Sequence, residues 1–251
     1  STGRGTLGKA YCYQITPGAT LFFDEPMNLY AGAGALGVCY DDYNADNFDH
    51  AKLDFIHGAV ISMTQTGKRP IESNAVMPGT PAWGADFKKA SIHAFNRSLG
   101  IGAQGASMPY RYNYLSLDDT YKDAYGLPLL RMTYNFTDQD RALFAFITGK
   151  IEEAARAMNP KGMVSKPNAK DYNIVPYQTT HNTGGTLMGE SPDDSVVNSY
   201  LQHWDADNLF VVGAGNFPHN GGCNPTGTVG ALSFRCAEGV LKYAEKGGKL
   251  A

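Results

Sequence analysis

The segments His181-Asn-Thr-Gly-Gly-Thr-Leu-Met-Gly189 and Asn224-Pro-Thr-Gly-Thr-Val-Gly-Ala-Leu232 decide how the rest of the chain is interpreted. The first places a histidine ahead of three glycines, on a loop whose backbone can approach a ligand closely. The second predicts a helix, because Asn224 suits the N-cap and Pro225 suits the first helical position. A helix start offers unpaired N–H groups that stabilise an electron-rich ligand. Together the two segments predict a ligand-facing site.

Each part of this region has an ordinary explanation when it is taken alone. His181 can act as a general base near neutral pH, or it can be a structural loop histidine. Asn208–Gly215 predicts an apolar strand that ends in Gly-Ala-Gly, which is typical of a sheet edge beside a cofactor but also of glycine packing. Asn224 is explained equally well by helix capping. The combination is therefore more informative than any one part.

Composition bounds the function classes. The 251 residues carry a net charge of -3, which gives no basic surface and argues against nucleic acid as the main partner. Hydrophobic residues make up 43% and charged residues 18%, which predicts a globular core. No run approaches the length of a membrane span, and the polar start lacks a signal peptide. The four cysteines lack C-x-x-C spacing, so we expect buried free thiols and no metal site.

One glycine motif has to be tested as a nucleotide site. Gly32-Ala-Gly-Ala-Leu-Gly37 matches G-x-G-x-x-G, a pattern that binds dinucleotides only between an apolar strand and an amphipathic helix. Residues 38–47 that follow are no helix, because they are rich in Asp, Asn and Tyr. We therefore predict a glycine-rich loop between strands rather than a cofactor loop.

The remaining pattern predicts an α+β fold with a mostly antiparallel sheet backed by helices. His57 is interpreted as a residue of a strand, because no second metal ligand stands near it at metal spacing. Residues 159–180 are polar and irregular. Strands are expected at 11–15, 20–23, 55–64, 114–118 and 129–136, and helices at 86–96 and from the Thr137–Asp140 cap to Met158.

The conjunction of motifs resembles the C-terminal part of the glucose–methanol–choline (GMC) family of FAD-dependent oxidoreductases. Four features follow one another from His181 to Thr228. They are the motif H-x-x-G-x-x-x-M-G, a strand that ends in small residues, the pair F-P, and the motif N-P-x-G-T at the start of a helix. The upstream segments resemble the bacterial branch that acts on sugars, sugar acids and polyols. These segments are Gly5-Thr-Leu-Gly-Lys9, Asp46-Asn-Phe-Asp-His50, Thr66-Gly-Lys-Arg-Pro-Ile71, Pro78-Gly-Thr-Pro81 and Lys122-Asp-Ala-Tyr-Gly-Leu-Pro128.

The resemblance implies roles for individual residues. His181 would take the hydroxyl proton of the substrate while hydride passes to the N5 atom of FAD, and Asn224 would be its catalytic partner. The turn at Gly213 and Ala214 would lie near the FAD phosphates. Asn224, Pro225 and Thr226 would face the flavin ring, where reduction places negative charge. His219 is a secondary candidate for contact with substrate, because Asn224 already fills the partner position.

The resemblance also implies a domain plan and partners. Residues 1–20 would connect from the FAD domain, 21–172 would form the substrate domain, and 173–251 would return into the FAD domain as an α/β remnant. The N-terminal Rossmann unit of the family is missing from this sequence, so we expect a C-terminal fragment. A cytochrome c acceptor subunit, a small subunit and a periplasmic or peripheral inner-membrane location are implied, with a cytoplasmic location otherwise. A non-catalytic carbohydrate-binding module remains the alternative function.

Overall fold

The computed structural model describes residues 5–31, 37–63, 75–168, 170–175 and 180–250. The chain divides into two compact units, which are described separately. Unit 1 consists of residues 1–14, 106–137 and 171–251, and unit 2 consists of residues 15–105 and 138–170. Each unit is therefore assembled from segments that are distant in the sequence. The functional domain plan predicted above stays a prediction.

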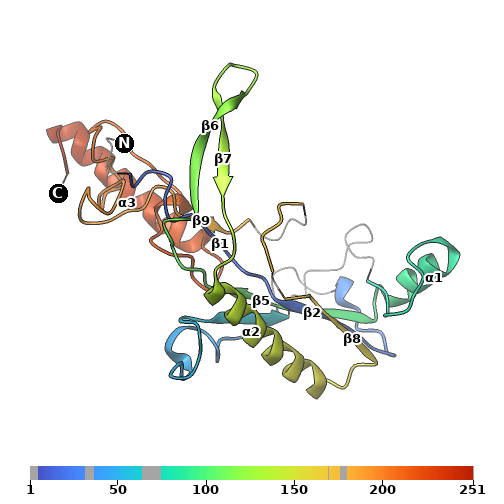
Figure 1. The fold of residues 1–251 in the computed structure, drawn as a ribbon. Coiled ribbons are helices and arrows are strands. Elements are labelled where there is room, and N and C mark those ends of the chain that lie inside the picture. Colours follow the sequence, from blue (N-terminus) through green and yellow to red (C-terminus); the bar gives the residue numbers. More distant parts are fainter. Residues whose placement is uncertain (1–4, 32–36, 64–74, 169, 176–179, 251) are drawn as a thin grey trace. The chain divides into compact units, whose positions relative to one another are not determined.

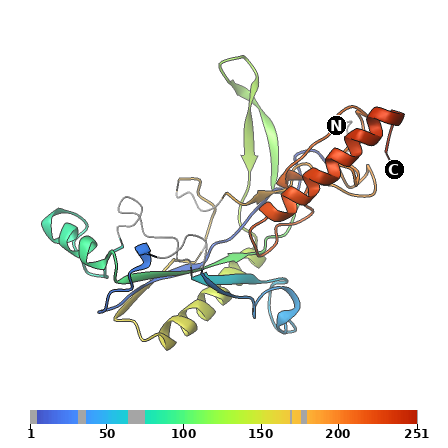
Figure 2. The same cartoon turned by 180° about the vertical axis from the view of Figure 1, so that it is seen from behind.

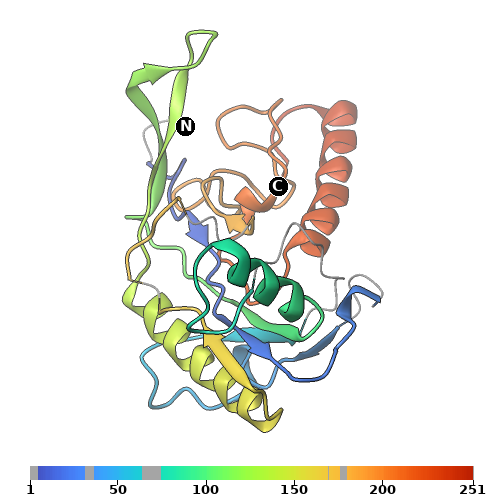
Figure 3. The ribbon, with the colours of Figure 1, turned by 90° about the vertical axis from the view of Figure 1, so that its right-hand side faces the viewer.

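Unit 2 is a five-stranded antiparallel sheet in the order β3-β4-β5-β2-β8, with α2 across one face (Figures 1 and 3). This confirms the predicted antiparallel sheet backed by a helix. Its elements are β2 (Gly18–Phe22), η1 (Leu29–Ala31), β3 (Val38–Tyr40), η2 (Ala45–Asn47), β4 (Ala59–Met63), α1 (Gly84–Ala94), β5 (Ser98–Gly105), α2 (Asp138–Ala157) and β8 (Gly162–Ser165).

The two faces of this sheet differ because side chains alternate along each strand. One face carries the buried residues Leu21, Ile61, Leu99, Ile101 and Ala103. The buried stripe of α2 includes Leu143, Ile147 and Ile151. On the other face the central pairs between β2, β5 and β4 are small or hydroxylated. There Thr20 lies opposite Gly100, and both Gly18 and Ser62 lie opposite Gly102. The sheet therefore has one core face and one face whose centre carries glycine and hydroxyl groups.

Unit 1 contains two small antiparallel pairs and a long helix (Figures 1 and 2). The strand β1 (Cys12–Tyr13) pairs with β9 (Asn182–Thr183), and β6 (Tyr114–Lys122) pairs with β7 (Pro128–Thr133) as a hairpin. The other elements are η3 (Ala214–Asn216) and α3 (Thr226–Lys246). Val196, Val197 and Leu201 form a small core with Cys236 of α3.

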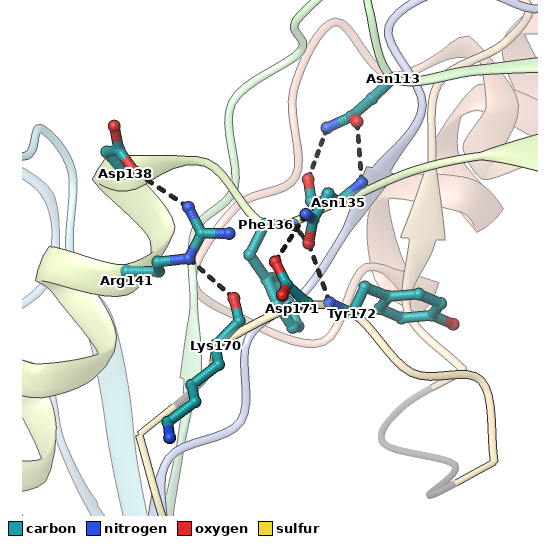
Figure 4. Close-up of polar contacts among 8 residues, drawn as sticks. All are labelled: Asn113, Asn135, Phe136, Asp138, Arg141, Lys170, Asp171 and Tyr172. Carbon is teal, nitrogen blue, oxygen red and sulfur yellow. Dashed lines mark hydrogen bonds and ion pairs between the residues drawn. The ribbon is translucent and has the colours of Figure 1, made fainter.

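Asn135 holds three stretches of unit 1 together (Figure 4). Its backbone exchanges two hydrogen bonds with the Asn113 side chain, of 3.0 and 3.1 Å. Its own amide donates to Asp171 Oδ1 at 2.9 Å and accepts from the Tyr172 N–H at 2.8 Å. Tyr172 also packs edge-on against Tyr13 of β1, with ring centroids 5.0 Å apart. This network therefore supports the strand that leads to the candidate site.

Within unit 2, Arg141 at the start of α2 secures the segment that ends at residue 170 (Figure 4). Its guanidinium donates to the Lys170 carbonyl at 2.7 Å and pairs with the exposed Asp138 carboxylate at 2.9 Å. The exposed ion pair contributes little to stability, whereas the hydrogen bond fixes the path of the chain.

Several predicted elements are wrong in detail. Asn208–Gly215 forms no strand, because only a single bridge joins Gln202 to Phe210 before the chain enters η3. Instead, the ring of Phe210 packs against Tyr243 of α3. The strand predicted from residue 55 begins only at Ala59, because His57 has a φ of 64° and lies outside any strand.

Four strands have no counterpart among the predictions, the short β3 and β9 and the strands β5 and β8. β5 lies in glycine-rich sequence and β8 in polar sequence, so neither shows the alternation of apolar and polar residues that predicts a strand. β5 is nevertheless the central strand of the sheet. The predicted loop at Gly32–Gly37 lies, except for Gly37, outside the described residues, as does the segment Thr66–Ile71.

The cysteines agree only partly with the expectation of buried thiols. Cys12 and Cys236 are buried, whereas Cys39 and Cys223 are exposed, and no disulfide joins these four described residues. Across the described ranges, no helix is long and apolar enough to cross a membrane.

Candidate active site

The pairing of β1 with β9 brings Gln14 opposite His181. Cys12 pairs with Thr183 and Tyr13 with Asn182, so the next position of the same register places Gln14 across from His181. Directly opposed side chains on antiparallel neighbours lie on the same side of the pair. Gln14 Oε1 lies 2.6 Å from His181 Nδ1. A contact between residues 167 positions apart therefore follows from the register.

The other end of the Gln14 amide holds the segment that precedes α3. Its Nε2 donates to the Gly221 carbonyl at 2.9 Å and to the Cys223 carbonyl at 3.2 Å. The Gln14 side chain is fully buried. One buried amide therefore joins His181 to the residues immediately before Asn224.

Asn220 supports His181 from a second direction. Its Nδ2 donates to the His181 carbonyl at 2.6 Å, and its backbone exchanges two hydrogen bonds with Ser107. Asn220 is fully buried, and its Oδ1 has no hydrogen-bond partner among the described residues. Such an uncompensated buried acceptor costs stability unless a further group satisfies it. The backbone of His181 is thus fixed independently of its ring.

The glycines after His181 permit close packing against η3 and β1. Gly184 N donates to the Ala214 carbonyl at 3.3 Å, and Thr186 N donates to the Gly215 carbonyl at 3.1 Å. At Gly184 the φ angle is 84°, and an added Cβ would lie 2.0 Å from the Ala10 carbonyl oxygen. The structure therefore brings the predicted turn at Gly213 and Ala214 beside the His181 loop.

The start of α3 differs from the prediction. The helix begins at Thr226 with Pro225 at the N-cap, so Asn224 is not the capping residue, and no side-chain hydrogen bond caps the helix. The reason is that the chain turns into the helix one residue later than the Asn-Pro pattern suggests. Asn224 is exposed, as are Thr226 and Thr228. The first turn of α3 therefore presents its backbone N–H groups outward.

The geometry separates the predicted residues into two groups. His181, Gly213 and Ala214 are brought together through direct hydrogen bonds of their loops. Asn224 follows directly after Cys223, whose carbonyl Gln14 holds, and His219 is half-buried beside Asn220. The sequence interpretation missed Gln14 and Asn220. A glutamine within the aromatic run at residues 11–15 was the available signal for Gln14, because a buried amide needs specific partners.

The exposed start of α3 fits an electron-rich ring such as reduced flavin. The helix spans 21 residues, so its aligned peptide dipoles place partial positive charge at Thr226. An added Cβ at Gly227 or Gly230 would meet nothing within 4 Å, so the surface there is open to a ligand. Pro225 and Thr226 lie at this open helix start, and their contact with a flavin stays a prediction. The described part of the chain has no group of three or more His, Cys, Asp or Glu side chains that could hold a metal ion.

Comparisons with known proteins show the family to which the chain is similar. Residues 109–233 match the family described as GMC oxidoreductase. The chain is 41% identical to the gluconate 2-dehydrogenase flavoprotein of Pantoea cypripedii over 99% of this chain and 41% of that protein. It is 34% identical to the fructose dehydrogenase large subunit of Gluconobacter japonicus over 92% of this chain and 40% of that protein. The chain thus spans about two fifths of the length of these relatives.

The fold agrees as well. Formate oxidase of Aspergillus oryzae RIB40, in a study of FAD modification, aligns with a TM-score of 0.58 at 13% identity. The alignment covers 96% of this chain and 48% of that one. FAD, which was predicted as the cofactor, is the cofactor named for this neighbour and accords with the flavoprotein among the relatives. The chain belongs to the GMC oxidoreductase family and contains its C-terminal domain.

Proposed function

We propose that the protein formed by this chain oxidises a CH–OH group of a sugar, sugar acid or polyol, with FAD as cofactor and His181 as the base. The observation that carries this proposal is the buried support of His181 by Gln14 and Asn220, within the unit that also presents the uncapped start of α3. A histidine that merely filled a loop would need no such support. The family match favours this function over the carbohydrate-binding module.

Oxidation of an alcohol removes a proton from oxygen and a hydride from carbon. His181 would accept the hydroxyl proton, which becomes more acidic as the hydride leaves. Bound FAD would supply the hydride acceptor at N5. Asn224 would orient the hydroxyl, because its exposed amide can both donate and accept a hydrogen bond. The N–H groups at Thr226 would stabilise the negative charge that reduction places on the flavin ring.

Unit 2 independently offers a surface suited to a polyhydroxylated ligand. A hollow of about 460 Å³ lies over the face paved with Gly18, Gly100 and Gly102, and Thr20 and Ser62 line it. An added Cβ at Gly100 would meet nothing within 4 Å, so the hollow depends on the absence of side chains there. Hydroxyl groups on an open sheet face can exchange hydrogen bonds with sugar hydroxyls.

Lys166 adds a charge to the same hollow. Its Nζ donates to the Thr16 carbonyl at 3.0 Å. Although much of the residue is exposed, the local burial of the ammonium lowers the pKa of Lys166. An ammonium kept in a partly desolvated position gains from an anionic partner. This supports a sugar acid, with its carboxylate, as one class of substrate.

The names of the relatives motivate the proposals about substrate and partners. One relative is a gluconate dehydrogenase flavoprotein and another is the large subunit of a fructose dehydrogenase. We therefore propose a sugar or sugar-acid substrate and transfer of electrons to a separate acceptor subunit. The predicted cytochrome c partner, small subunit and periplasmic location stay predictions.

The test is His181→Ala in the FAD-loaded protein. We expect kcat to fall by about two to four orders of magnitude while the flavin absorption spectrum is unchanged, which is the usual effect of losing a general base. His219→Ala is compared with it, because His219 is the secondary candidate for contact with substrate and its loss should have the smaller effect. Near-normal turnover of His181→Ala would exclude the proposed role.

A further inference from the structure

We propose that Gln14 is the positioning residue of the His181 base, and that it holds the imidazole in the tautomer with the proton on Nδ1. In this tautomer the lone pair is on Nε2, which is then the atom that accepts the substrate proton. The inference rests on the proposed function and adds a residue that the sequence interpretation did not identify.

The hydrogen bonds of Gln14 determine which way its amide faces. The NH2 group can donate two hydrogen bonds, and both are directed to backbone carbonyls, those of Gly221 and Cys223. The reversed amide would set its oxygen against two carbonyl oxygens, all of them acceptors. Oε1 must therefore be the atom that faces His181 Nδ1 at 2.6 Å.

The orientation of the amide in turn determines the tautomer. A neutral imidazole carries one N–H, and an amide oxygen can only accept a hydrogen bond. His181 Nδ1 must therefore carry the hydrogen, which leaves Nε2 as the basic nitrogen. When Nε2 takes up a proton, the Nδ1–H bond to Oε1 is retained and becomes charge-assisted. Gln14 thus serves both protonation states of the base without turning.

The surroundings make this arrangement rigid. Gln14 is fully buried, so water does not compete for its oxygen. The β1–β9 register fixes where the Gln14 and His181 backbones lie, and a shift by one residue would turn Gln14 to the other face. The Nε2 bonds also hold the segment that ends at Asn224. Gln14 therefore sets the position of the base relative to its proposed partner within unit 1.

A purely structural role for Gln14 is the competing explanation, and the chain offers a matched control. Gln202 is also buried, and its Nε2 likewise donates to two backbone carbonyls, those of Asp207 at 2.7 Å and Gly248 at 2.9 Å. Its Oε1 accepts from the Leu250 N–H at 2.8 Å instead of from a histidine. Substituting Gln202 therefore reproduces the structural loss without touching a base.

The experiment combines flavin reduction kinetics with nitrogen-15 NMR of labelled histidine in the FAD-loaded protein. The His181 signal is assigned by its loss in His181→Ala. We expect the Nδ1–H tautomer in the unsubstituted protein. Gln14→Met should lose this preference and reduce flavin about 10- to 100-fold more slowly, the usual cost of losing a partner that orients a functional histidine. Gln14→Glu keeps the acceptor and should keep the Nδ1–H tautomer, although its second oxygen would face the Gly221 and Cys223 carbonyls and should lower Tm. It therefore separates loss of the tautomer from loss of the structural hydrogen bonds.

Gln202→Met should change neither the tautomer nor the rate of flavin reduction. An Nε2–H tautomer in the unsubstituted protein would overturn the inference without any Gln14 variant, so the test does not depend on Gln14→Met folding. An unchanged rate in Gln14→Met would also overturn it. A normal rate of flavin reduction in His181→Ala would refute the proposed role of His181 as the base, and with it the role of Gln14. Loss of activity in His181→Ala with a normal rate in Gln14→Met would refute the positioning role alone.

Discussion

Replacing Gly184 by alanine tests whether close packing of the His181 loop against β1 is required for activity. Gly184 has a φ of 84°, and the new Cβ would lie 2.0 Å from the Ala10 carbonyl oxygen. Real Cβ atoms do not approach closer than 3.0 Å, so the loop or β1 must move by about 1 Å. The carbonyl belongs to the backbone beside β1, so no flexible side chain can give way. The contact between Gln14 and His181 would be displaced.

Two costs follow from this substitution. Left-handed backbone costs a non-glycine residue about 1–2 kcal/mol, and forcing atoms into a packed region adds about 1–3 kcal/mol. A displacement of about 1 Å can slow catalysis about 100-fold. Gly185→Ala is the matched control, because its φ is 95° but its added Cβ would meet only ordinary contacts, the nearest at 3.5 Å. Gly185→Ala should therefore show the cost of left-handed backbone without the cost of forcing atoms into a packed region.

The assay is thermal unfolding of the FAD-loaded protein together with the rate of flavin reduction by substrate. We expect Gly184→Ala to be less stable than Gly185→Ala and to reduce flavin about 100-fold more slowly than it. Equal stability and equal rates for the two variants would refute the reasoning, because the strain at positive φ is common to both.

Two further predictions concern the hollow of unit 2. Gly100→Val should raise KM at least about tenfold without lowering Tm, because the new side chain enters the open space of the hollow from a strand. Gly105→Val is the control and should lower Tm, because its Cβ would meet Ile15 at 2.5 Å. A lower Tm with unchanged KM for Gly100→Val would contradict this prediction. Lys166→Met should raise KM for a sugar acid more than for a neutral sugar. Burial lowers the pKa of Lys166 in the folded state below its value in the unfolded chain. Between these two pKa values the unfolded chain binds more protons than the folded protein, so the free energy of unfolding rises with pH across that interval. Lys166→Met should remove that rise, which thermal unfolding measured across alkaline pH detects. A rise that persists in the variant, with equal KM changes for both substrates, would contradict the assignment.

The sequence was informative where local rules act within one segment. The 3.6-residue recurrence of Leu143, Ile147 and Ile151 predicted α2, and the structure buries these three residues. The glycines after His181 predicted a loop whose backbone approaches a ligand closely. In the structure Gly184 packs closely against the backbone of Ala10, and the approach to a ligand stays a prediction. The antiparallel character of the sheet was also predicted, because no strand–helix rhythm appeared.

The sequence failed where partners are distant. The strand β5 escaped prediction because glycine at alternate positions replaces the polar residues expected of an exposed face. The segment Asn208–Gly215 looked like a strand because it is apolar, but its residues pack on α3 without forming a ladder. Whether an apolar segment becomes a strand depends on available partners, which local pattern does not contain.

The sequence by itself identified the candidate histidine, the glycine-rich loop that carries it and the helix that follows Asn224. The loop and the helix depend on backbone preferences within a few residues, which a local pattern contains. Only the tertiary structure decided what holds the histidine. Gln14 and Asn220 reach His181 through pairing between segments far apart in the chain, and the side of β1 that Gln14 occupies is a property of register. Register is set by the packing of the whole unit, so a base can be identified from its motif while the residue that orients it cannot.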